Sequence, residues 1–209
     1  IGESTIVLVG ERAATRPGTL SAINDLDSTV RVAWVPRRAG EMGAIEAGLL
    51  PQLLPGGRLV DDAKARVDIA AAWGVTNLPT QPGLDTAGML AAAQAGKLDA
   101  LVVSGVELAD MPDPIGAREA VENCGFVVSV EQRFSEVSAR ADVVLPVCLL
   151  EETSGTFLDW EHRPGRVRVV NKQPATPMNE IRVLDALSSQ MGSVFGLATV
   201  AQAHKAWRD

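Results

Sequence analysis

The sequence is poor in cysteine and histidine and contains no tyrosine. Its 209 residues include two Cys and two His. Cys124 and Cys148 have neither a C-x-x-C spacing nor a disulfide framework, so we expect two reduced thiols. His162 lies in a charged turn and His204 on the exposed side of a predicted final helix, so both are expected to be solvated. We predict no metal site and no catalytic residue, because these residues show no ligand spacing and offer no plausible base for a Ser-His-Asp or Cys-His arrangement.

Positive charge and long apolar runs are also scarce. The net charge of −7 argues against a nucleic-acid partner, whose binding surface needs clustered Lys and Arg. No apolar run approaches the ~20 residues of a membrane span, and the longest, residues 143–150, is interrupted by Pro146. The sequence has no basic region followed by an apolar segment, so it contains no pattern that would predict secretion. We therefore expect no membrane insertion, and the abrupt start without Met predicts a piece of a longer polypeptide.

Alternating strands and helices are the main feature that the sequence does have. Apolar residues make up 46% of the chain and aromatics only 4%, so the core must consist of Val, Leu, Ile and Ala. From residue 85 onward, strands at 100–104, 126–130 and 142–147 alternate with helical patterns over short connections. This alternation predicts parallel pairing and right-handed crossovers. The expected fold class is therefore α/β, with a doubly wound, mostly parallel sheet and helices on both faces.

The chain is expected to divide into two domains. Residues 1–150 are predicted to form the doubly wound domain, which starts with strands at 5–9 and 30–35. Residues 36–60 hold clusters of Pro and Gly without a sustained period, which predicts a long irregular excursion. Residues 151–209 are predicted to belong to an adjoining α/β subdomain and to pack against material outside this sequence.

The carboxyl-terminal segment is expected to contain a strand pair and two helices. A strand at 167–170 is predicted to pair with the segment 156–160. A helix is predicted from Asn179, because apolar residues then recur at helical spacing. The residues of this helix that should face inward are Leu184, Leu187 and Met191.

The strand at 142–147 is apolar on both sides. Such a strand is typical of a sheet that is covered on both faces. Open α/β sheets bind their ligands beyond the carboxyl ends of the strands. The residues that leave this strand, and those at equivalent ends of the other strands, are therefore candidates for a binding crevice.

The turn Gly10-Glu11-Arg12 is the first such candidate. It follows a strand and precedes a helix, a position where helix amides can hold an anion. No phosphate-loop fingerprint is present, however, and Glu11 would repel a phosphate. A strand-to-helix turn that needs the backbone freedom of Gly is the simpler interpretation.

Two later strands end in further polar residues. Gly105-Val106-Glu107 follows one strand and Glu131-Gln132-Arg133 ends the next. Together with Arg37 and Arg38, these residues could line one crevice in which an Arg binds phosphate or carboxylate. The nearby carboxylates predict internal ion pairs equally well.

Two charged segments follow the last of these strands. Glu151 and Glu152 are adjacent, so only one can face the crevice and they are not a catalytic pair. We expect the one that faces inward to accept hydrogen bonds from the amides of the Gly155-Thr156 turn. The basic run further on is interpreted as the solvated face of a hairpin, or alternatively as a docking surface for an acidic partner. It consists of Arg163, Arg166, Arg168 and Lys172.

Several segments resemble the molybdopterin oxidoreductases, such as formate dehydrogenases and nitrate reductases. Residues 38–57 resemble a glycine-rich stretch that ends in Leu-Pro-Gly. Residues 96–105 resemble a strand that enters the cofactor crevice of those enzymes. Ala141 to Pro146 with Glu152-x-x-Gly-Thr-Phe157 and Arg163 resembles a further, more specific segment. Together the matches cover roughly residues 4–192.

Other residues resemble one branch of this family more closely. Asp159 stands where active relatives usually have Asn, and a carboxylate fits poorly beside an anionic pterin phosphate. Trp160-Glu161-x-Arg163 resembles the large iron–sulfur subunit of bacterial NADH–quinone oxidoreductase (complex I). Residues 33–40 resemble actinobacterial versions of that subunit. This resemblance implies a domain without a molybdenum cofactor, and iron–sulfur ligands in an amino-terminal region that this sequence lacks.

The resemblance implies a role in electron transfer from NADH through iron–sulfur clusters to quinone. This segment itself is expected to bind no cofactor, to have no activity and to act as a scaffold with a vestigial crevice. Its partners would be other subunits of the hydrophilic arm, on the cytoplasmic face of the plasma membrane. The alternatives are part of a true molybdopterin oxidoreductase, such as a formate dehydrogenase, and a free-standing nucleotide-binding module. The residues expected to line the vestigial crevice are Gly10, Arg37, Arg38, Gly105, Glu107, Gln132, Arg133, Glu152, Thr156 and Asp159.

Overall fold

The chain consists of two compact α/β units. The computed structural model describes residues 4–171 and 177–208. Unit 1 comprises Ile1–Gly83 and Thr156–Gly165, and unit 2 comprises Leu84–Gly155 and Arg166–Asp209. The α/β class is confirmed, but the units divide differently from the expected domains, because a hairpin after residue 155 belongs to unit 1 and a later helix packs on the sheet of unit 2.

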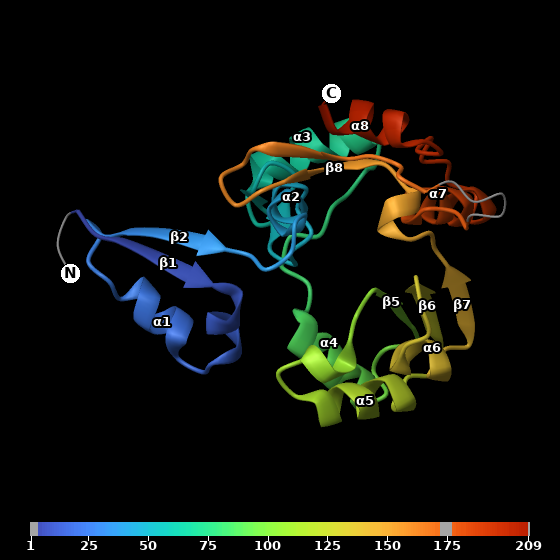
Figure 1. Cartoon of the computed structure of the whole chain (residues 1–209), viewed down its shortest axis with the longest axis horizontal. Coiled ribbons are helices and arrows are strands. Elements are labelled where there is room, and N and C mark those ends of the chain that lie inside the picture. The colour runs from blue at the N-terminus through green and yellow to red at the C-terminus, as the bar shows by residue number, and fades with distance from the viewer. Residues whose placement is uncertain (1–3, 172–176, 209) are drawn as a thin grey trace. The chain divides into compact units, whose positions relative to one another are not determined.

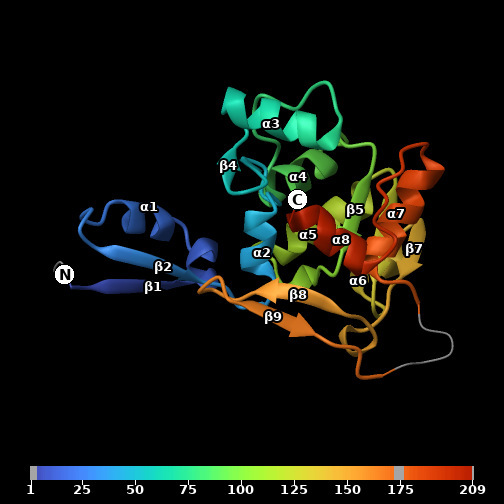
Figure 2. The same ribbon diagram turned by 90° about the horizontal axis from the view of Figure 1, so that it is seen from above.

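Unit 1 begins with a two-stranded parallel sheet. Strands β1 (Ile6–Gly10) and β2 (Arg31–Val35) pair in register from Ile6 opposite Arg31 to Gly10 opposite Val35. The 3-10 helix η1 (Glu11–Thr15) and the helix α1 (Thr19–Asn24) connect them, and α1 lies beside the two strands (Figures 1 and 2). Both predicted strands are confirmed.

The segment 36–60 contains more regular structure than expected. The helix α2 (Glu41–Glu46) is followed by a small antiparallel hairpin of β3 (Leu53–Leu54) and β4 (Arg58–Leu59). Gly48 connects them with φ +82°, and a Cβ there would lie 2.6 Å from the carbonyl carbon of Leu54. Only glycine allows this close approach, which explains a Gly in what otherwise resembles an irregular loop.

Helix α3 (Ala63–Trp73) completes this part of unit 1. The Asp62 side chain caps it by accepting from the amides of Lys64 and Ala65 at 2.8 and 3.3 Å, and Gly74 ends it in the left-handed conformation. Buried residues of α3 pack against the β3–β4 hairpin in a cluster of Leu54, Val60, Ala65 and Ile69.

Strands β8 (Gly155–Leu158) and β9 (Pro164–Val167) form a two-stranded sheet, seen clearly in Figure 2. The predicted pairing of the segment 156–160 with a later strand is confirmed, but β9 shares only Val167 with the strand predicted at 167–170. Gly165 allows the strands to approach, because any side chain at that position would collide with the ring of Phe157.

Unit 2 contains a three-stranded parallel sheet in the order β5-β6-β7. Its strands are β5 (Leu101–Ser104), β6 (Val127–Glu131) and β7 (Val143–Pro146). The connecting elements follow in chain order: α4 (Thr86–Gln94) precedes β5, η2 (Leu108–Asp110) and α5 (Pro114–Asn123) precede β6, and α6 (Glu136–Arg140) precedes β7. The predicted alternation of strands and helices is therefore confirmed.

The main core of unit 2 lies between this sheet and its helices. Val127 of β6 is completely buried and packs with Ala93 of α4, Ala117 and Ala120 of α5, and Val137 of α6. The small alanines bring the helices close to the sheet. A core of small aliphatic residues is what the low aromatic content predicts.

The central strand is β6, and the prediction that the strand at 142–147 is covered on both faces is wrong. β7 pairs only with β6 among the described strands, and Val143 and Val144 are 37% and 41% exposed. On β6, by contrast, Val127 and Val130 are buried on opposite faces. An all-apolar sequence is thus found on an edge strand, because the order of strands in a sheet depends on contacts distant in sequence.

The carboxyl-terminal helices belong to unit 2. After the 3-10 helix η3 (Leu150–Glu152), helix α7 (Glu180–Gln190) packs Val183 against Val130 and Val147. The predicted inward residues of α7 are wrong, since Leu184, Leu187 and Met191 are all partly or largely exposed while Val183 and Ser188 are buried. Helix α8 (Val200–Arg208) follows. Within the described residues, no helix combines the length and the apolar character needed to cross a membrane.

Candidate functional site

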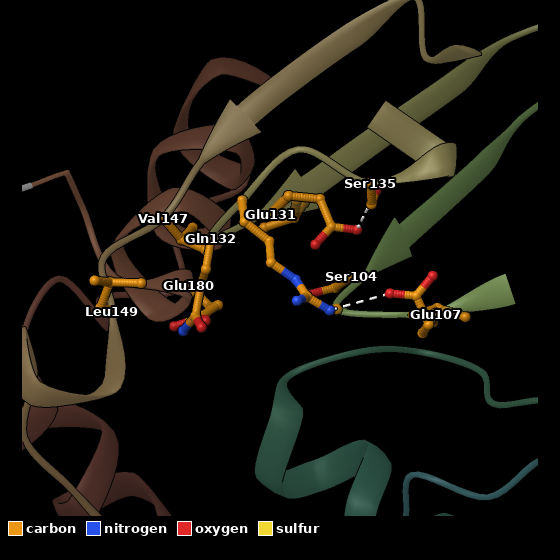
Figure 3. Close-up of a pocket in the computed structure, with 12 residues that line it drawn as sticks. Ser104, Glu107, Glu131, Gln132, Ser135, Val147, Leu149 and Glu180 are labelled. Carbon is orange, nitrogen blue, oxygen red and sulfur yellow. Dashed lines mark hydrogen bonds and ion pairs between the residues drawn. The ribbon is translucent and has the colours of Figure 1, made fainter. Parts of the chain in front are cut away.

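A pocket of about 400 Å³ lies at the carboxyl ends of β5 and β6 in unit 2. We call it the strand-end pocket, and Figure 3 shows the residues that line it. Its position is where parallel α/β sheets bind ligands. The polar side chains among its lining residues are Ser104, Glu107, Glu131, Gln132, Arg133, Ser135 and Glu180.

The only cationic side chain of this lining is already paired. Arg133 donates from Nη2 to Oε2 of Glu107 over 3.0 Å, which joins the end of β6 to the turn after β5 (Figure 3). The predicted alternative of an internal ion pair is therefore confirmed. Because the guanidinium already has a carboxylate partner, an incoming anion would have to compete with Glu107 for it.

Glu131 lies at the buried side of the pocket. The residue is 8% exposed, and its Oε1 accepts a hydrogen bond from the Ser135 hydroxyl over 3.2 Å. Ser135 in turn accepts from the amide of Ser138 at 3.1 Å and so caps α6. The carboxylate is thus held by the start of the following helix, as Figure 3 also shows.

One backbone feature and one side-chain hydrogen bond fix the ends of the strands. Gly105 has φ +60°, a left-handed conformation that favours glycine, and its amide donates to the Val130 carbonyl over 3.3 Å. Gln132 donates from Nε2 to the Cys148 carbonyl over 3.0 Å, which ties β6 to the segment after β7. The pocket is therefore built from strand ends that neighbouring segments anchor.

The electrostatics of the strand-end pocket oppose an anionic ligand. Its ionisable side chains are the carboxylates Glu107, Glu131 and Glu180 and the single guanidinium of Arg133. Carboxylates repel phosphate, and the repulsion is stronger in a partly buried site than in bulk water. A cofactor that carries phosphates, such as a pterin nucleotide, fits this set of side chains poorly.

The predicted crevice residues Arg37 and Arg38 contact carboxylates within unit 1. Arg37 donates from its amide and from Nε to Oε2 of Glu11, at 3.3 and 3.0 Å. Arg38 places Nη1 3.9 Å from Oε1 of Glu11 and 3.4 Å from Oε1 of Glu41. Both arginines are therefore engaged with carboxylates, and Gly10 lines an apolar pocket of unit 1.

Two of the remaining predicted crevice residues are not part of the lining of the strand-end pocket. Glu152 accepts at Oε2 from the amide of Leu149 over 2.9 Å, so the prediction that the Gly155-Thr156 turn would hold an inward-facing Glu is wrong for this residue. Thr156 is exposed in β8. Neither lines the strand-end pocket.

Asp159 organises the turn between β8 and β9. Its Oδ1 accepts from the amides of Glu161 and Arg163, both at 2.9 Å, and its Oδ2 accepts from Nε of Arg163 at 2.9 Å. The amide of Arg163, and then its guanidinium, hold the pKa of Asp159 below its ordinary value. Asp159 therefore serves here as a turn carboxylate.

The cysteines and histidines also occupy structural positions. Cys124 and Cys148 are buried free thiols, and burial raises the pKa of Cys148. His162 is not simply solvated, because its Nδ1 contacts a carboxylate oxygen of Glu46. His204 stacks on Trp207 with ring centroids 6.3 Å apart. Among the described residues, no cluster of three or more His, Cys, Asp or Glu could hold a metal ion.

The pocket combines predicted and unpredicted residues. Gly105, Glu107, Gln132 and Arg133 were predicted and line it together. Ser104, Ser135 and Glu180 were not predicted. Ser135 could have been predicted from the sequence, because it stands where a serine caps the next helix. Glu180 could not, because it comes from a helix distant in sequence.

Comparisons with known proteins agree with the fold and the resemblance. The molybdopterin oxidoreductase family profile matches residues 5–190. The G subunit of the NADH-quinone oxidoreductase of Streptomyces coelicolor is 55% identical over 168 residues, which cover 79% of this chain and 20% of that protein. The same subunit of Mycobacterium tuberculosis is 47% identical over 209 residues, or 96% of this chain and 25% of that protein.

Similarity to enzymes of the same family is lower. A putative formate dehydrogenase of Bacillus subtilis is 34% identical over 126 residues, which cover 60% of this chain and 13% of that protein. The chain thus spans about a quarter or less of the length of these relatives. The predicted resemblance to the large subunit of NADH–quinone oxidoreductase is confirmed, and the chain belongs to the molybdopterin oxidoreductase family.

Proposed function

We propose that this chain is a region of the large iron–sulfur subunit of an NADH–quinone oxidoreductase and contributes to that complex as a scaffold without a redox centre. Sequence similarity supports the assignment, since identity is 55% and 47% to two such subunits but 34% to a putative formate dehydrogenase. The electron carriers would then be iron–sulfur clusters bound elsewhere in the full-length protein.

The strand-end pocket is the observation that supports the absence of a pterin cofactor. Its guanidinium is paired with Glu107, and two further carboxylates, Glu131 and Glu180, line the same space. A pterin nucleotide would have to place its phosphates among three carboxylates and break the ion pair of Arg133. We infer that the pocket is a vestige of a cofactor site that now stabilises the sheet.

The scaffold role follows from how the pocket residues are used. Each strand end is tied to a neighbouring segment by a named contact, from Arg133 to Glu107, from Ser135 to Glu131 and from Gln132 to the carbonyl of Cys148. Such contacts fix the positions of the strand ends relative to the neighbouring segments. The partners would be other subunits of the hydrophilic arm, and the complex would lie on the cytoplasmic face of the plasma membrane.

Metal and pterin analysis of the purified full-length subunit tests this proposal. Molybdenum and tungsten would be measured by mass spectrometry, and pterin by the fluorescence of its oxidised form. We expect both metals and pterin to be far below one per subunit. A formate dehydrogenase prepared from the same host would serve as the positive control. One molybdenum or tungsten per subunit would instead support the alternative of a molybdopterin enzyme.

A further inference from the structure

Unit 1 contains an open apolar groove of about 640 Å³. One wall is the face of the parallel sheet that carries Val9, Val32 and Trp34, and a second wall is α1. The third wall is α2 with the turn after it. We call this space the β1–β2 groove, and its principal apolar lining residues are Leu20, Ile23, Ile45, Leu49 and Leu50.

The sheet beside this groove lacks the cover that its kind requires. Parallel sheets occur almost only where both faces are buried, and two strands alone are marginally stable in water. Yet Val32 is 47% exposed on the groove face, and Leu8 is 61% exposed on the opposite face. Among the described residues of unit 1, α1 and α2 border the groove face of these strands without covering it, so apolar surface remains open.

Glu41 adds a specific polar requirement to the groove. It lines the groove together with the apolar residues. Its Oε1 is 3.4 Å from Nη1 of Arg38, whereas its Oε2 is buried without a hydrogen-bond partner. A buried carboxylate oxygen without a hydrogen-bond donor is destabilising. Within the described residues, the groove therefore has apolar surface that nothing covers and a carboxylate oxygen, Oε2 of Glu41, that no donor reaches.

We propose that the β1–β2 groove receives an amphipathic helix whose apolar stripe carries one Lys or Arg opposite Glu41. A helix is the element that covers parallel strands, and its apolar residues at i, i+3, i+4 and i+7 match a groove between a sheet and two helices. A cationic donor satisfies Oε2 of Glu41 and completes the pairing of Arg38, Glu41 and Glu11.

The helix comes from the same longer polypeptide. This chain spans 20–25% of the length of its relatives from Streptomyces coelicolor and Mycobacterium tuberculosis, so a full-length protein of that size has ample further sequence to supply a helix. A segment linked to the groove also binds without the entropic cost that a separate partner has. This inference does not depend on the proposed absence of a pterin cofactor.

Photo-crosslinking in the full-length subunit tests the proposal. A benzophenone amino acid would replace Leu20 or Leu49, both exposed at the groove, and mass spectrometry would identify the linked peptide. We expect both positions to label one helical segment of the same polypeptide, outside these 209 residues, with a Lys or Arg in its apolar stripe. The matched control is Ile115 on α5, which is 69% exposed and should not label that segment.

A charge reversal then tests the role of Glu41. Glu41→Lys should lower the crosslink yield from position 20 by about ten-fold, because it places like charges opposite each other. Asp61→Lys, the same charge change at an exposed residue outside the groove lining, should leave the yield unchanged. Circular dichroism of both variants would verify that they fold.

Four outcomes would overturn the proposal. Crosslinks to another subunit of the complex would show a partner in trans, and crosslinks to a second copy would show self-association. Labelling confined to these 209 residues would show that the groove closes on itself. Equal crosslink yields from folded Glu41→Lys and Asp61→Lys variants would show that no cation faces Glu41.

Discussion

The two parallel sheets carry the same kind of ion pair at their strand ends, but they differ in how far helices cover them. In unit 1, Glu11 follows β1 and pairs with Arg37, which follows β2, over 3.0 Å. In unit 2, Glu107 follows β5 and pairs with Arg133, which follows β6, also over 3.0 Å. The partners are 26 residues apart in both cases. Each pair thus occupies the ends of adjacent parallel strands.

The cover of the sheets distinguishes the two regions. Val127 of β6 is 0% exposed beneath three helices, whereas Leu8 of β1 is 61% exposed. The comparison shows that an ion pair can form at the ends of two parallel strands whether or not the strands themselves are buried. Unit 2 buries its central strand β6, although Val102 of β5 is 65% exposed. In unit 1 the strand ends are paired, but neither strand is buried in the same way.

The largest expected difference between the sheets concerns their stability. Val127→Ala should lower the free energy of unfolding by about 2 kcal/mol, because it removes buried methyl groups and leaves a cavity. Val32→Ala on the exposed face of β2 should cost less than about 0.5 kcal/mol. Urea unfolding followed by circular dichroism would measure both. Equal costs would mean that Val32 is buried and that the described contrast in cover is absent.

Replacing glycine by alanine in the turn after the first strand should affect the stability of the two sheets differently. Gly105 has φ +60° and Gly10 has φ −78°, and neither would bring a Cβ within 4 Å of another atom. Gly105→Ala should therefore cost about 1 kcal/mol through backbone strain alone, whereas Gly10→Ala should cost much less. Thermal unfolding of the two variants gives the comparison, and a larger loss for Gly10→Ala would contradict it.

The ion pairs at the strand ends should contribute little to stability. Glu107→Gln and Glu11→Gln should each lower the free energy of unfolding by about 0.5 kcal/mol or less, since both pairs are solvent-accessible. Glu11→Gln should be slightly more costly, because Glu11 also faces Arg38. In the intact complex, Glu107→Gln should leave NADH–quinone turnover unchanged. A large loss of turnover would contradict a scaffold role.

Each unit also offers a carboxylate whose titration can be followed separately. A guanidinium lowers the pKa of Glu136, through its hydrogen bond from Arg118, and the amide of Arg163 leads the causes that lower the pKa of Asp159. Both depressed pKa values stabilise the fold above the unfolded pKa, and this contribution is lost as pH falls through the folded pKa. Carbon-13 NMR titration should therefore show both groups ionised below their ordinary range.

The matched variants separate the two causes. Arg118→Gln should raise the pKa of Glu136 almost to its ordinary value, because the guanidinium is the only partner that lowers it. Arg163→Gln should raise the pKa of Asp159 only in part, because backbone amides remain. A full return for Asp159 would show that the turn amides contribute little.

Local features of the sequence predicted most of the secondary structure. Asp62, Asp85 and Asp113 cap the helices that follow them, and such capping depends on residues within one turn. The alternation of strands with helices also predicted parallel pairing. These features are encoded over short distances.

Features that depend on distant contacts were not predictable in the same way. The sequence of β7 is apolar throughout, but its edge position follows from the order of the strands. Likewise, α7 buries Val183 rather than Leu184 because its orientation is set by the sheet on which it packs. In the pocket, Glu107 and Arg133 were predicted from strand ends, while Glu180 comes from a helix that no local pattern connects to β5.

The most direct test of a pocket closed to anions is titration with pyrophosphate, the anionic group of a pterin nucleotide. Nitrogen-15 NMR would follow the amides of Gly105 and Ser135 at the strand-end pocket. We predict no saturable shift up to about 1 mM, which corresponds to binding weaker than about 4 kcal/mol. Saturable binding in the micromolar range at these amides would contradict the claim that Glu107, Glu131 and Glu180 exclude an anionic cofactor.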